Sequence, residues 1–372
     1  MKSMYSSESV PFNDLSRTAP DVMTRIKSAV SRVLDSGWYV MGPEHDAFEV
    51  ELGEYLGVAE VIAVGNGTDA LELALAAVGV EAFDTVLTVA NAGAFATTAT
   101  RLLGAVSTYC DVSEDSLLLA PESVRLWLSS AEILPRAIVV THLYGAMAQV
   151  EEIVRIAREF GVAVVEDCAQ SIGARVGGRQ SGTFGDIATT SFYPTKNLGA
   201  LGDGGAVFTN NPELANRVRR MRQYGWISKY RIGVDHGRNS RMDEIQAAVL
   251  RVKLPLLDSW NDRRREIHSR YASVAPIGAH LVHGSSESFT SHLAVLVCQD
   301  RDGVRASLKD AGIGTDVHYP LPDHKQAFPS GATGPLSLPV TERAARSVLS
   351  LPMFPELTDD EVSRVLEALR SL

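Results

Sequence analysis

Apolar and polar positions follow two alternating patterns between residues 20 and 210 of the chain. Short runs of apolar, often β-branched residues predict buried strands, and apolar residues three or four positions apart predict amphipathic helices between them. Short buried strands separated by helices are typical of a parallel sheet covered on both faces, so we predict an α/β fold with a mostly parallel sheet. The strands are predicted at 61–64, 84–89, 137–140 and 163–165, and the helices at 21–34, 68–78, 94–103 and 149–160.

The pattern changes in the second half of the chain. Glycines around residues 173–182 predict a hairpin, and a long helix is predicted from Met242 through Pro255 towards Arg270. Shorter strands and helices follow, and proline and glycine gather at 320–339, which predicts a surface loop. A chain of this length allows a large domain and a smaller one. We place a large α/β domain at residues 1–255 and a small α+β domain at residues 256–372.

Composition narrows the class of protein. The net charge of -10 argues against a nucleic-acid partner, because phosphate backbones attract basic surfaces. The 3 cysteines form no CxxC pair, which favours reduced thiols in the cytoplasm and gives no sign of a metal site. Residues 1–11 lack the apolar core of a secretion signal, and no run reaches the roughly 18 apolar residues that span a bilayer. We expect a soluble, cytoplasmic protein.

One turn has the composition of an anion-binding site. The strand at 61–64 runs into Gly65-Asn-Gly-Thr68, which opens a helix, and free N–H groups at a helix N-terminus attract phosphate. The alternative is a capped turn, with Asn66 or Thr68 as the N-cap. The turn also fits the loose dinucleotide pattern G-x-G-x-x-A, but the acid that should end the next strand is missing, since Asp84 precedes that strand. No P-loop sequence is present.

A lysine and an aspartate farther along the chain suggest covalent chemistry. Lys196 follows a short β-rich run and precedes a glycine-rich segment, so it can be shielded from water, lose its proton and form an imine with an aldehyde. Asp167 closes an apolar strand, and a carboxylate there would keep a pyridine nitrogen protonated. Ser191 could bind a phosphate and Gln170 a ring. Each of these residues alone is common in proteins without such a role. Their order along the chain, with an anion turn, a strand-end aspartate, a serine five residues before a lysine and a glycine-rich segment, suggests an enzyme that uses pyridoxal phosphate.

Together with neighbouring segments, these residues resemble the nucleotide-sugar aminotransferase family, the DegT–StrS group, over nearly the whole chain. The resemblance implies the aspartate aminotransferase fold (fold type I of the pyridoxal phosphate enzymes) and a homodimer with the active site at the subunit interface. The matching segments are Gly37–Glu44, Gly65–Leu71, His142–Gly145, Glu166–Gln170, Ser191–Gly205 and Asn239–Ala248.

The resemblance also implies a role for individual residues. Lys196 would hold the cofactor as an imine and shuttle protons, and Asp167 would pair with the pyridine nitrogen. Gln170 would lie near the ring. The phosphate would be held by Gly67, Thr68 and Ser191, and by Asn239 of the partner subunit.

Two positions carry alternatives. Asn239 and Ser240 also fit a helix N-cap before Met242, and both roles are compatible. Family members commonly place an aromatic residue over the cofactor ring at the position that aligns with Gly93. Phe95, two residues later, either takes that stacking role or is an ordinary core residue.

The expected reaction is transamination. Some relatives carry histidine at the lysine position and perform dehydration, so Lys196 favours amino transfer. Thr315–Pro320 resembles the segment of relatives that act at sugar C-3, which makes His318 and Tyr319 candidate substrate-binding residues; otherwise it is a strand running into a loop. We expect L-glutamate, released as 2-oxoglutarate, to aminate a nucleotide-diphosphate keto-deoxysugar, with a dTDP-3-keto-6-deoxyhexose preferred.

Three alternatives stay open at this point. A C-4 aminotransferase acting on a dTDP-, GDP- or UDP-linked 4-keto-6-deoxysugar would differ only in its pocket. A nicotinamide oxidoreductase would carry no lysine imine. A non-catalytic regulatory relative would bind the cofactor without converting a sugar.

Overall fold

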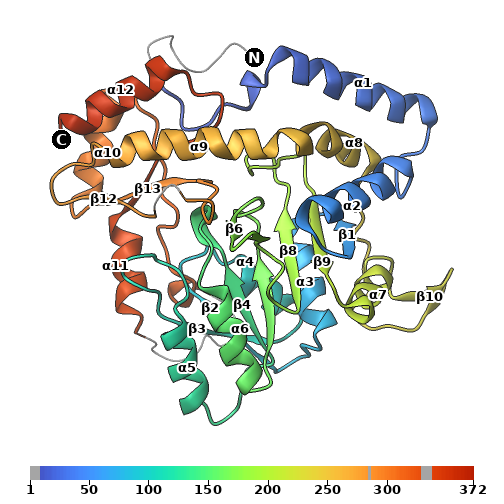
Figure 1. Ribbon diagram of the computed structural model, residues 1–372. Helices are drawn as coiled ribbons and strands as arrows, with labels where there is room; N and C mark the ends of the chain where they lie inside the picture. The colour runs from blue at the N-terminus through green and yellow to red at the C-terminus, as the bar shows by residue number, and fades with distance from the viewer. Residues whose placement is uncertain (1–8, 284–285, 328–336) are drawn as a thin grey trace.

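The computed structural model describes residues 9–283, 286–327 and 337–372, and its centre is a seven-stranded sheet (Figure 1). The strands are β1 (Glu60–Val64), β2 (Thr85–Val89), β3 (Val106–Cys110), β4 (Ala137–Thr141), β5 (Ala163–Asp167), β8 (Ile187–Ser191) and β9 (Gly205–Thr209). Their order is β1-β9-β8-β5-β4-β2-β3. Strand β9 is antiparallel to both neighbours, and the other pairs are parallel. The predicted α/β class with a mostly parallel sheet is confirmed.

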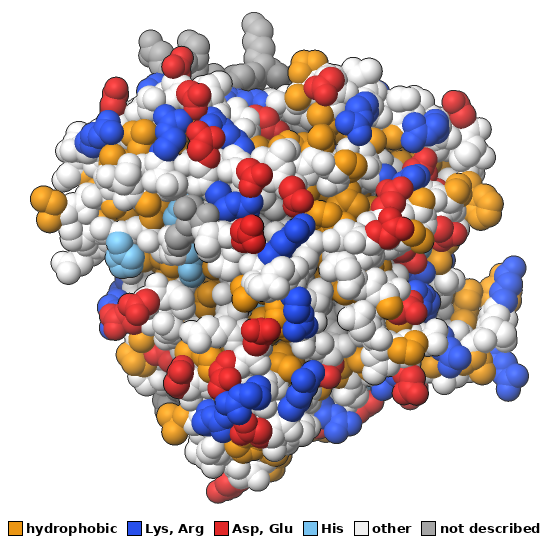
Figure 2. Space-filling model, in the orientation of Figure 1, with side chains coloured by type: hydrophobic (Ala, Val, Ile, Leu, Met, Phe, Trp, Pro, Cys, Tyr) orange, Lys and Arg blue, Asp and Glu red, His pale blue; other side chains and the backbone are white. Residues whose placement is uncertain are grey.

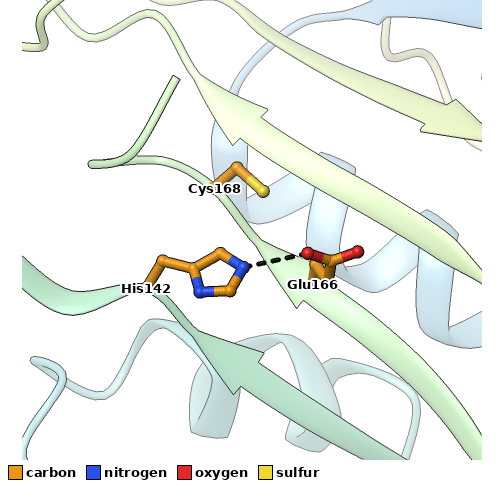
Figure 3. Close-up of side chains that lie close together, drawn as sticks. All are labelled: His142, Glu166 and Cys168. Atoms are coloured by element: carbon orange, nitrogen blue, oxygen red, sulfur yellow. Dashed lines mark hydrogen bonds and ion pairs between the residues drawn. The ribbon is translucent and has the colours of Figure 1, made fainter. Parts of the chain in front are cut away.

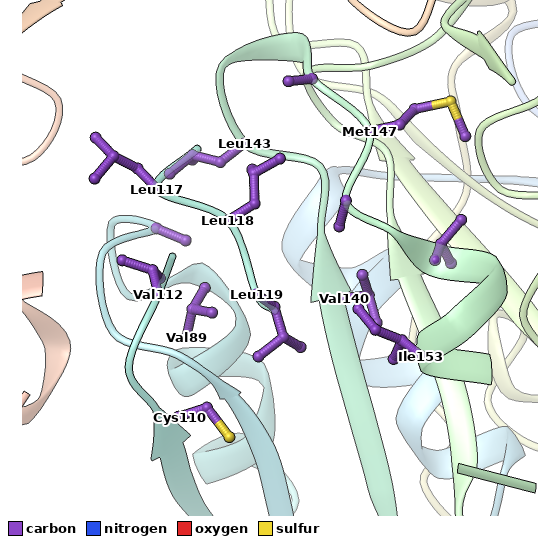
Figure 4. Packing of buried hydrophobic residues seen from close by; sticks show 14 of the residues in the cluster. Val89, Cys110, Val112, Leu117, Leu118, Leu119, Val140, Leu143, Met147 and Ile153 are labelled. Atoms are coloured by element: carbon purple, nitrogen blue, oxygen red, sulfur yellow. The ribbon is translucent and has the colours of Figure 1, made fainter. Parts of the chain in front are cut away.

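Helices cover both faces of this sheet because successive strand residues point to opposite sides. Val140 belongs to an apolar cluster with Ile153 of α6, whereas Val139 belongs to a second cluster on the other face. Figure 4 shows Val140 and Ile153 packed with Val89 and Leu119. The first face is covered by α5 (Pro121–Ser130) and α6 (Val150–Glu159), and the second by α3 (Gly67–Ala77), α4 (Phe95–Leu102) and α7 (Pro212–Met221).

All eight helices and strands predicted before residue 170 are present, with ends that shift by a few residues. The hairpin at 173–182 is also present, as β6 (Arg175–Val176) and β7 (Arg179–Gln180) around Gly177 and Gly178, both with positive φ. Sequence patterns missed β3, α5, α7 and β9. Strand β9 begins inside the glycine-rich segment, where the apolar run is short, so it was not recognised as a strand.

The long helix predicted from Met242 is divided. Helix α8 (Glu244–Lys253) is followed by a 3-10 turn, Leu254–Leu256, and by α9 (Leu257–Ala272). Pro255 explains the division, because it lacks an N–H group. The predicted N-cap at Asn239 and Ser240 is wrong: the helix starts at Glu244 after Asp243, and Asn239 instead pairs with Gln223 in an antiparallel bridge.

Helices α1 (Pro20–Ser36) and α2 (Pro43–Leu56) pack against α8, and α9 runs across the top of the sheet in Figure 1. Beyond α9 lies an antiparallel sheet of β12 (His280–Leu281), β13 (Ala294–Val297) and β14 (Val348–Leu351). It is flanked by α10 (Arg301–Asp310), α11 (Pro339–Ser347) and α12 (Asp359–Arg370), and it shares an apolar cluster with α9, α10 and α12. The division into domains at residue 255 stays a prediction.

The loop predicted at 320–339 lies partly outside the described residues. In its described part a 3-10 turn, Asp323–Lys325, is anchored rather than free at the surface. The Asp323 carboxylate is buried and accepts hydrogen bonds from the Ala94 amide at 2.9 Å and the Thr97 hydroxyl at 2.6 Å. Among the helices in the described residues, none is long and apolar enough to cross a membrane.

Candidate active site

A cavity of about 450 Å³ opens at the carboxyl edge of the parallel strands. Ligands of open α/β sheets bind at this edge. Its walls come from the segments after β1, β2, β5 and β8, and from the chain around residues 292 and 318. Nine of the ten predicted site residues line it: Gly67, Thr68, Phe95, Asp167, Gln170, Ser191, Lys196, His318 and Tyr319.

The predicted anion turn forms one end of the cavity. Gly67 opens α3, and the Asn66 side chain caps the helix by accepting a hydrogen bond from the Asp69 amide at 2.8 Å. A Cβ atom on Gly67 would lie 2.6 Å from Cβ of Ser191, so only glycine lets the helix N-terminus approach Ser191 this closely. The predicted helix cap is therefore confirmed, with Asn66 as the N-cap. The helix start and the Ser191 hydroxyl border the same cavity, and phosphate binding there stays a prediction.

Asp167 is the last residue of β5 and lies between Thr141 of β4 and Thr189 of β8 in register. Its carboxylate accepts hydrogen bonds from the Ala169 amide at 3.1 Å and, more weakly, from the Thr141 hydroxyl at 3.5 Å. Burial raises the pKa of Asp167 above its ordinary value, although these bonds and the charge of Lys196 oppose the rise. A buried carboxylate with so few donors fits a cationic ring N–H beside it.

Lys196 stands on a tight turn after β8. Its amide donates to the Tyr193 carbonyl at 2.8 Å, and the turn closes on Gly199, where a Cβ atom would lie 2.3 Å from the Pro194 oxygen. Burial lowers the pKa of the Lys196 amine to about 8, and the negative charge of Asp167 limits that fall. An amine with this pKa is a competent nucleophile and proton carrier near neutral pH.

Gln170 ties the far wall of the cavity to the sheet edge. Its Oε1 atom accepts from the Tyr144 amide at 2.6 Å, and its Nε2 donates to the Tyr319 hydroxyl at 3.3 Å. The Tyr144 hydroxyl in turn donates to the His318 carbonyl at 2.8 Å. These three bonds hold the 318–319 segment against β5, far away in the sequence.

Aromatic residues fill the space beside Gly93. A Cβ atom on Gly93 would lie 2.9 Å from the Tyr319 ring and 3.0 Å from the Phe95 ring, and Gly93 has φ of 77°. The two rings meet edge to face with centroids 6.2 Å apart. Phe95 is 46% exposed and lines the cavity, so it is not a core residue. Its stacking role stays a proposal.

Asn239 is the predicted site residue that this chain does not bring to its own cavity. It is exposed and forms the bridge with Gln223 described above. The resemblance assigned it to the cavity of the partner subunit, and that assignment remains a prediction.

Several cavity residues were missed from the sequence, including Tyr193, Asp203, His292 and Leu293. Asp203 belongs to the glycine-rich segment, in which the glycines carried the recognisable pattern. His292 stands before an apolar strand, where a single histidine has no spacing that distinguishes it from a core residue. Its placement depends on tertiary packing.

A buried cluster of three side chains near the cavity has a structural role. His142, Glu166 and Cys168 lie together beside the end of β5 (Figure 3). His142 Nε2 donates to Glu166 at 2.9 Å, and its Nδ1 accepts from the Ala148 amide at 3.1 Å.

Backbone amides complete the environment of Glu166. Its carboxylate also accepts from the amides of Gly182, Phe184 and Gly185. Burial alone would raise the pKa of Glu166, but the bond from His142 and these amides lower it below its ordinary value. With both ring nitrogens of His142 and the carboxylate engaged, the group braces the strand end that carries Asp167.

Comparison with known proteins identifies relatives along the whole chain. A sequence model of the DegT/DnrJ/EryC1/StrS aminotransferase family matches residues 20–370. The chain is 42% identical over 369 residues to the erythromycin biosynthesis sensory transduction protein EryC1 of Saccharopolyspora erythraea, covering 97% of this chain and 99% of that protein. It is 39% identical over 375 residues to a dTDP-3-amino-3,4,6-trideoxy-alpha-D-glucose transaminase of Streptomyces venezuelae, covering 100% and 98%. The crystal structure of NtdA from Bacillus subtilis with bound cofactor PMP superposes with a TM-score of 0.91 at 31% identity, covering 98% of this chain and 85% of that one.

Proposed function

The chain belongs to the DegT/DnrJ/EryC1/StrS aminotransferase family, and from this premise we propose that it aminates C-3 of a dTDP-linked 3-keto-6-deoxyhexose, with L-glutamate as donor. It is a sugar aminotransferase whose cofactor is pyridoxal phosphate. The observation that carries the proposal is the pairing of a half-buried lysine of lowered pKa with a buried strand-end carboxylate in one cavity. The sugar, the donor and the residue roles below are inferred.

The residues of the cavity fit pyridoxal phosphate. When bound, this cofactor withdraws electrons from the carbon that exchanges a proton and an amino group. We assign Asp167 to the pyridine nitrogen, because its buried carboxylate has few donors. The helix N-terminus at Gly67 and Thr68, with the Ser191 hydroxyl, suits the phosphate. Phe95 and Gln170 border the remaining space, which suits the ring.

Lys196 is assigned the two catalytic steps that need an amine. Its amine would hold the cofactor covalently at rest and, when free, would take up and return the proton at the reacting carbon. With a pKa of about 8, about a quarter of Lys196 is unprotonated at pH 7.5. An ordinary lysine would be about 0.1% unprotonated there. The cavity thus makes the free amine available without removing its ability to return the proton.

Tyr319 and His318 are assigned to the sugar. The Tyr319 hydroxyl accepts a hydrogen bond from Gln170, so its own proton can be donated into the cavity. Burial raises the pKa of Tyr319 to about 12, which keeps that proton in place at neutral pH. A fixed neutral donor suits a keto or hydroxyl oxygen of a sugar. The preference for C-3 rests on relatives that are named as transaminases of dTDP-linked 3-amino sugars.

The glutamate donor and the homodimer are linked proposals. Glutamate carries two carboxylates, yet among the described residues that line the cavity Lys196 is the one Lys or Arg. Further cations would have to come from a second subunit, as would Asn239. A hairpin of β10 (Trp226–Ser228) and β11 (Arg231–Ile232) projects from the body with basic side chains at its tip (Figures 1 and 2).

The hairpin also exposes apolar surface. Tyr230 is 77% and Ile232 68% exposed, as expected of a segment that packs against a second copy. We propose that the protein acts in the cytoplasm as a homodimer.

To test this proposal, the purified enzyme is incubated with glutamate and each member of a panel of 3-keto and 4-keto deoxysugar nucleotides. Mass spectrometry detects amination, and NMR locates the new amine. We expect an amine at C-3 and an equal amount of 2-oxoglutarate. An amine at C-4 would refute the regiochemistry, and 2-oxoglutarate formed without any aminated sugar would refute the sugar acceptor.

A regulatory role is the second candidate, favoured by one observation. The relative at 42% identity is named a sensory transduction protein. A regulator would bind the cofactor in the same cavity but would give no aminated product with any sugar of the panel. The same assay therefore separates the two candidates.

A further inference from the structure

His292 lines the active-site cavity beside Lys196 and belongs to a buried chain of amide hydrogen bonds. Its Nδ1 atom lies 2.8 Å from Oδ1 of Asn197, the residue that follows the lysine. Asn197 Nδ2 lies 2.7 Å from Asn261 Oδ1 and 3.2 Å from the Thr290 carbonyl. The side chains of His292, Asn197 and Asn261 are all buried.

Two backbone carbonyls determine the direction of every hydrogen bond in this buried series. Asn261 Nδ2 lies 3.1 Å from the Ile172 carbonyl, which only accepts, so the amide nitrogen of Asn261 must face it. Asn261 Oδ1 then faces Asn197, and the Thr290 carbonyl likewise requires the nitrogen of Asn197. Oδ1 of Asn197 is thereby turned to the histidine. The proton of the imidazole must therefore sit on Nδ1 of His292.

The other ring nitrogen of His292 is left as a bare acceptor. Within the described part of the chain no group donates to Nε2, and the residue borders the cavity. Burial, together with the charges of Lys196, Arg264 and His318, lowers the pKa of His292 well below its ordinary value. The ring is therefore neutral at physiological pH, with a lone pair at Nε2.

We propose that His292 is a substrate-contacting residue whose Nε2 accepts a hydrogen bond from a hydroxyl or amino group of the bound sugar. This assignment rests on the proposed function. A neutral lone pair repels a carboxylate, so the site suits a sugar with several O–H groups rather than the acidic side chain of the amino donor. The hydrogen bond between His292 and Asn197 joins this acceptor to the residue next to Lys196. A sugar bound to Nε2 is therefore held in a fixed position relative to the reacting amine.

The tautomer is tested first in the ligand-free protein. Nitrogen-15 NMR of histidine-labelled protein, with His292→Gln used to assign the signal, distinguishes a protonated Nδ1 from a protonated Nε2. We expect the Nδ1–H form, unchanged between pH 6 and 8. A protonated Nε2 would overturn the inference and would leave the proposed function untouched.

Two substitutions then separate contact from packing. His292→Asn keeps a donor near the Nδ1 position for Asn197 but has no atom at the Nε2 position, whereas His292→Gln places an oxygen near it. Calorimetry with the aminated sugar nucleotide should show about tenfold weaker binding for Asn and about threefold or less for Gln. His283→Asn and His283→Gln are matched controls, because His283 is packed beside Phe289, lines a different cavity, and should leave binding unchanged.

Each other outcome has a defined meaning. Equal losses for Asn and Gln, with both variants folded by circular dichroism, would overturn the acceptor role. Unchanged sugar binding with a raised KM for glutamate alone would overturn the choice of the sugar as the contact. Failure of the wild-type protein to bind any sugar nucleotide would overturn the proposed function itself, and with it this substrate.

Discussion

Gly67→Ala isolates the close contact on which the proposed phosphate site depends. In the interior of a helix this change stabilises by about 0.5–1 kcal/mol, because alanine is the better helix former. Here the new Cβ would lie 2.6 Å from Cβ, 3.1 Å from Oγ and 3.2 Å from Cα of Ser191. These atoms belong to a strand residue and cannot move as a flexible side-chain tip would.

The clash decides the sign of the effect. Overpacking of this kind costs about 1–3 kcal/mol, which exceeds the gain in helix propensity. We expect a net loss of about 1–2 kcal/mol in the free energy of unfolding. Displacement of the Ser191 hydroxyl should also weaken pyridoxal phosphate binding about tenfold, the equivalent of about 1.4 kcal/mol.

The assay pairs denaturant unfolding of the cofactor-free protein with cofactor titration by absorbance. Gly65→Ala is the matched control on the same turn, since its Cβ would lie 3.4 Å from Ser240 Oγ, an ordinary contact. The double variant Gly67→Ala/Ser191→Gly should regain stability but not cofactor affinity. Wild-type stability and affinity in Gly67→Ala would show that the contact with Ser191 does not limit this position, and equal losses in Gly65→Ala would show that the effect is not specific to it.

Two further predictions concern buried ionisable groups. Glu166→Gln should destabilise the fold by about 2–4 kcal/mol, because a carboxamide cannot accept from His142 and the three amides together. Since the pKa of Glu166 is lower in the folded state, its contribution to stability is fully present above the unfolded-state pKa near 4.3 and is lost as the pH falls through the folded-state pKa. Urea denaturation should therefore show wild type and variant converging in acid but not at pH 7. A constant difference at all pH values would contradict the charged assignment, and Glu152→Gln, at an exposed pair with Arg155, should change little. In the cofactor-free protein, amine labelling of Lys196 followed by mass spectrometry should show a midpoint near pH 8, and Asp167→Asn should move it lower, since the carboxylate supports the ammonium form. A midpoint near 10.4, or one that rises in the variant, would contradict the proximity of these two groups.

The sequence predicted those features that local patterns specify. Asp167 closes an apolar strand and Lys196 follows a short β-rich run, so the sequence alone predicts that both lie at one edge of the sheet. Asn66 capped its helix as its residue type suggested. These inferences needed only short stretches of chain and the rule that parallel strands end at one edge.

Other features depend on contacts between distant segments. The aromatic rings beside Gly93 come from Phe95 and from Tyr319, which is more than two hundred residues away, so no local pattern could indicate their contact. His292 acquires its meaning only through Asn197 and Asn261. Asn239 looked like a helix cap but is held by a bridge to Gln223, because tertiary pairing overrode its local preference.

Reductive trapping tests directly whether Lys196 holds the cofactor covalently. Treating the protein with pyridoxal phosphate and then borohydride converts any covalent attachment into a stable label, which peptide mapping locates. We expect one label, on Lys196, and none in Lys196→Ala. A label on another lysine, or a protein that binds the cofactor without being labelled, would contradict this expectation.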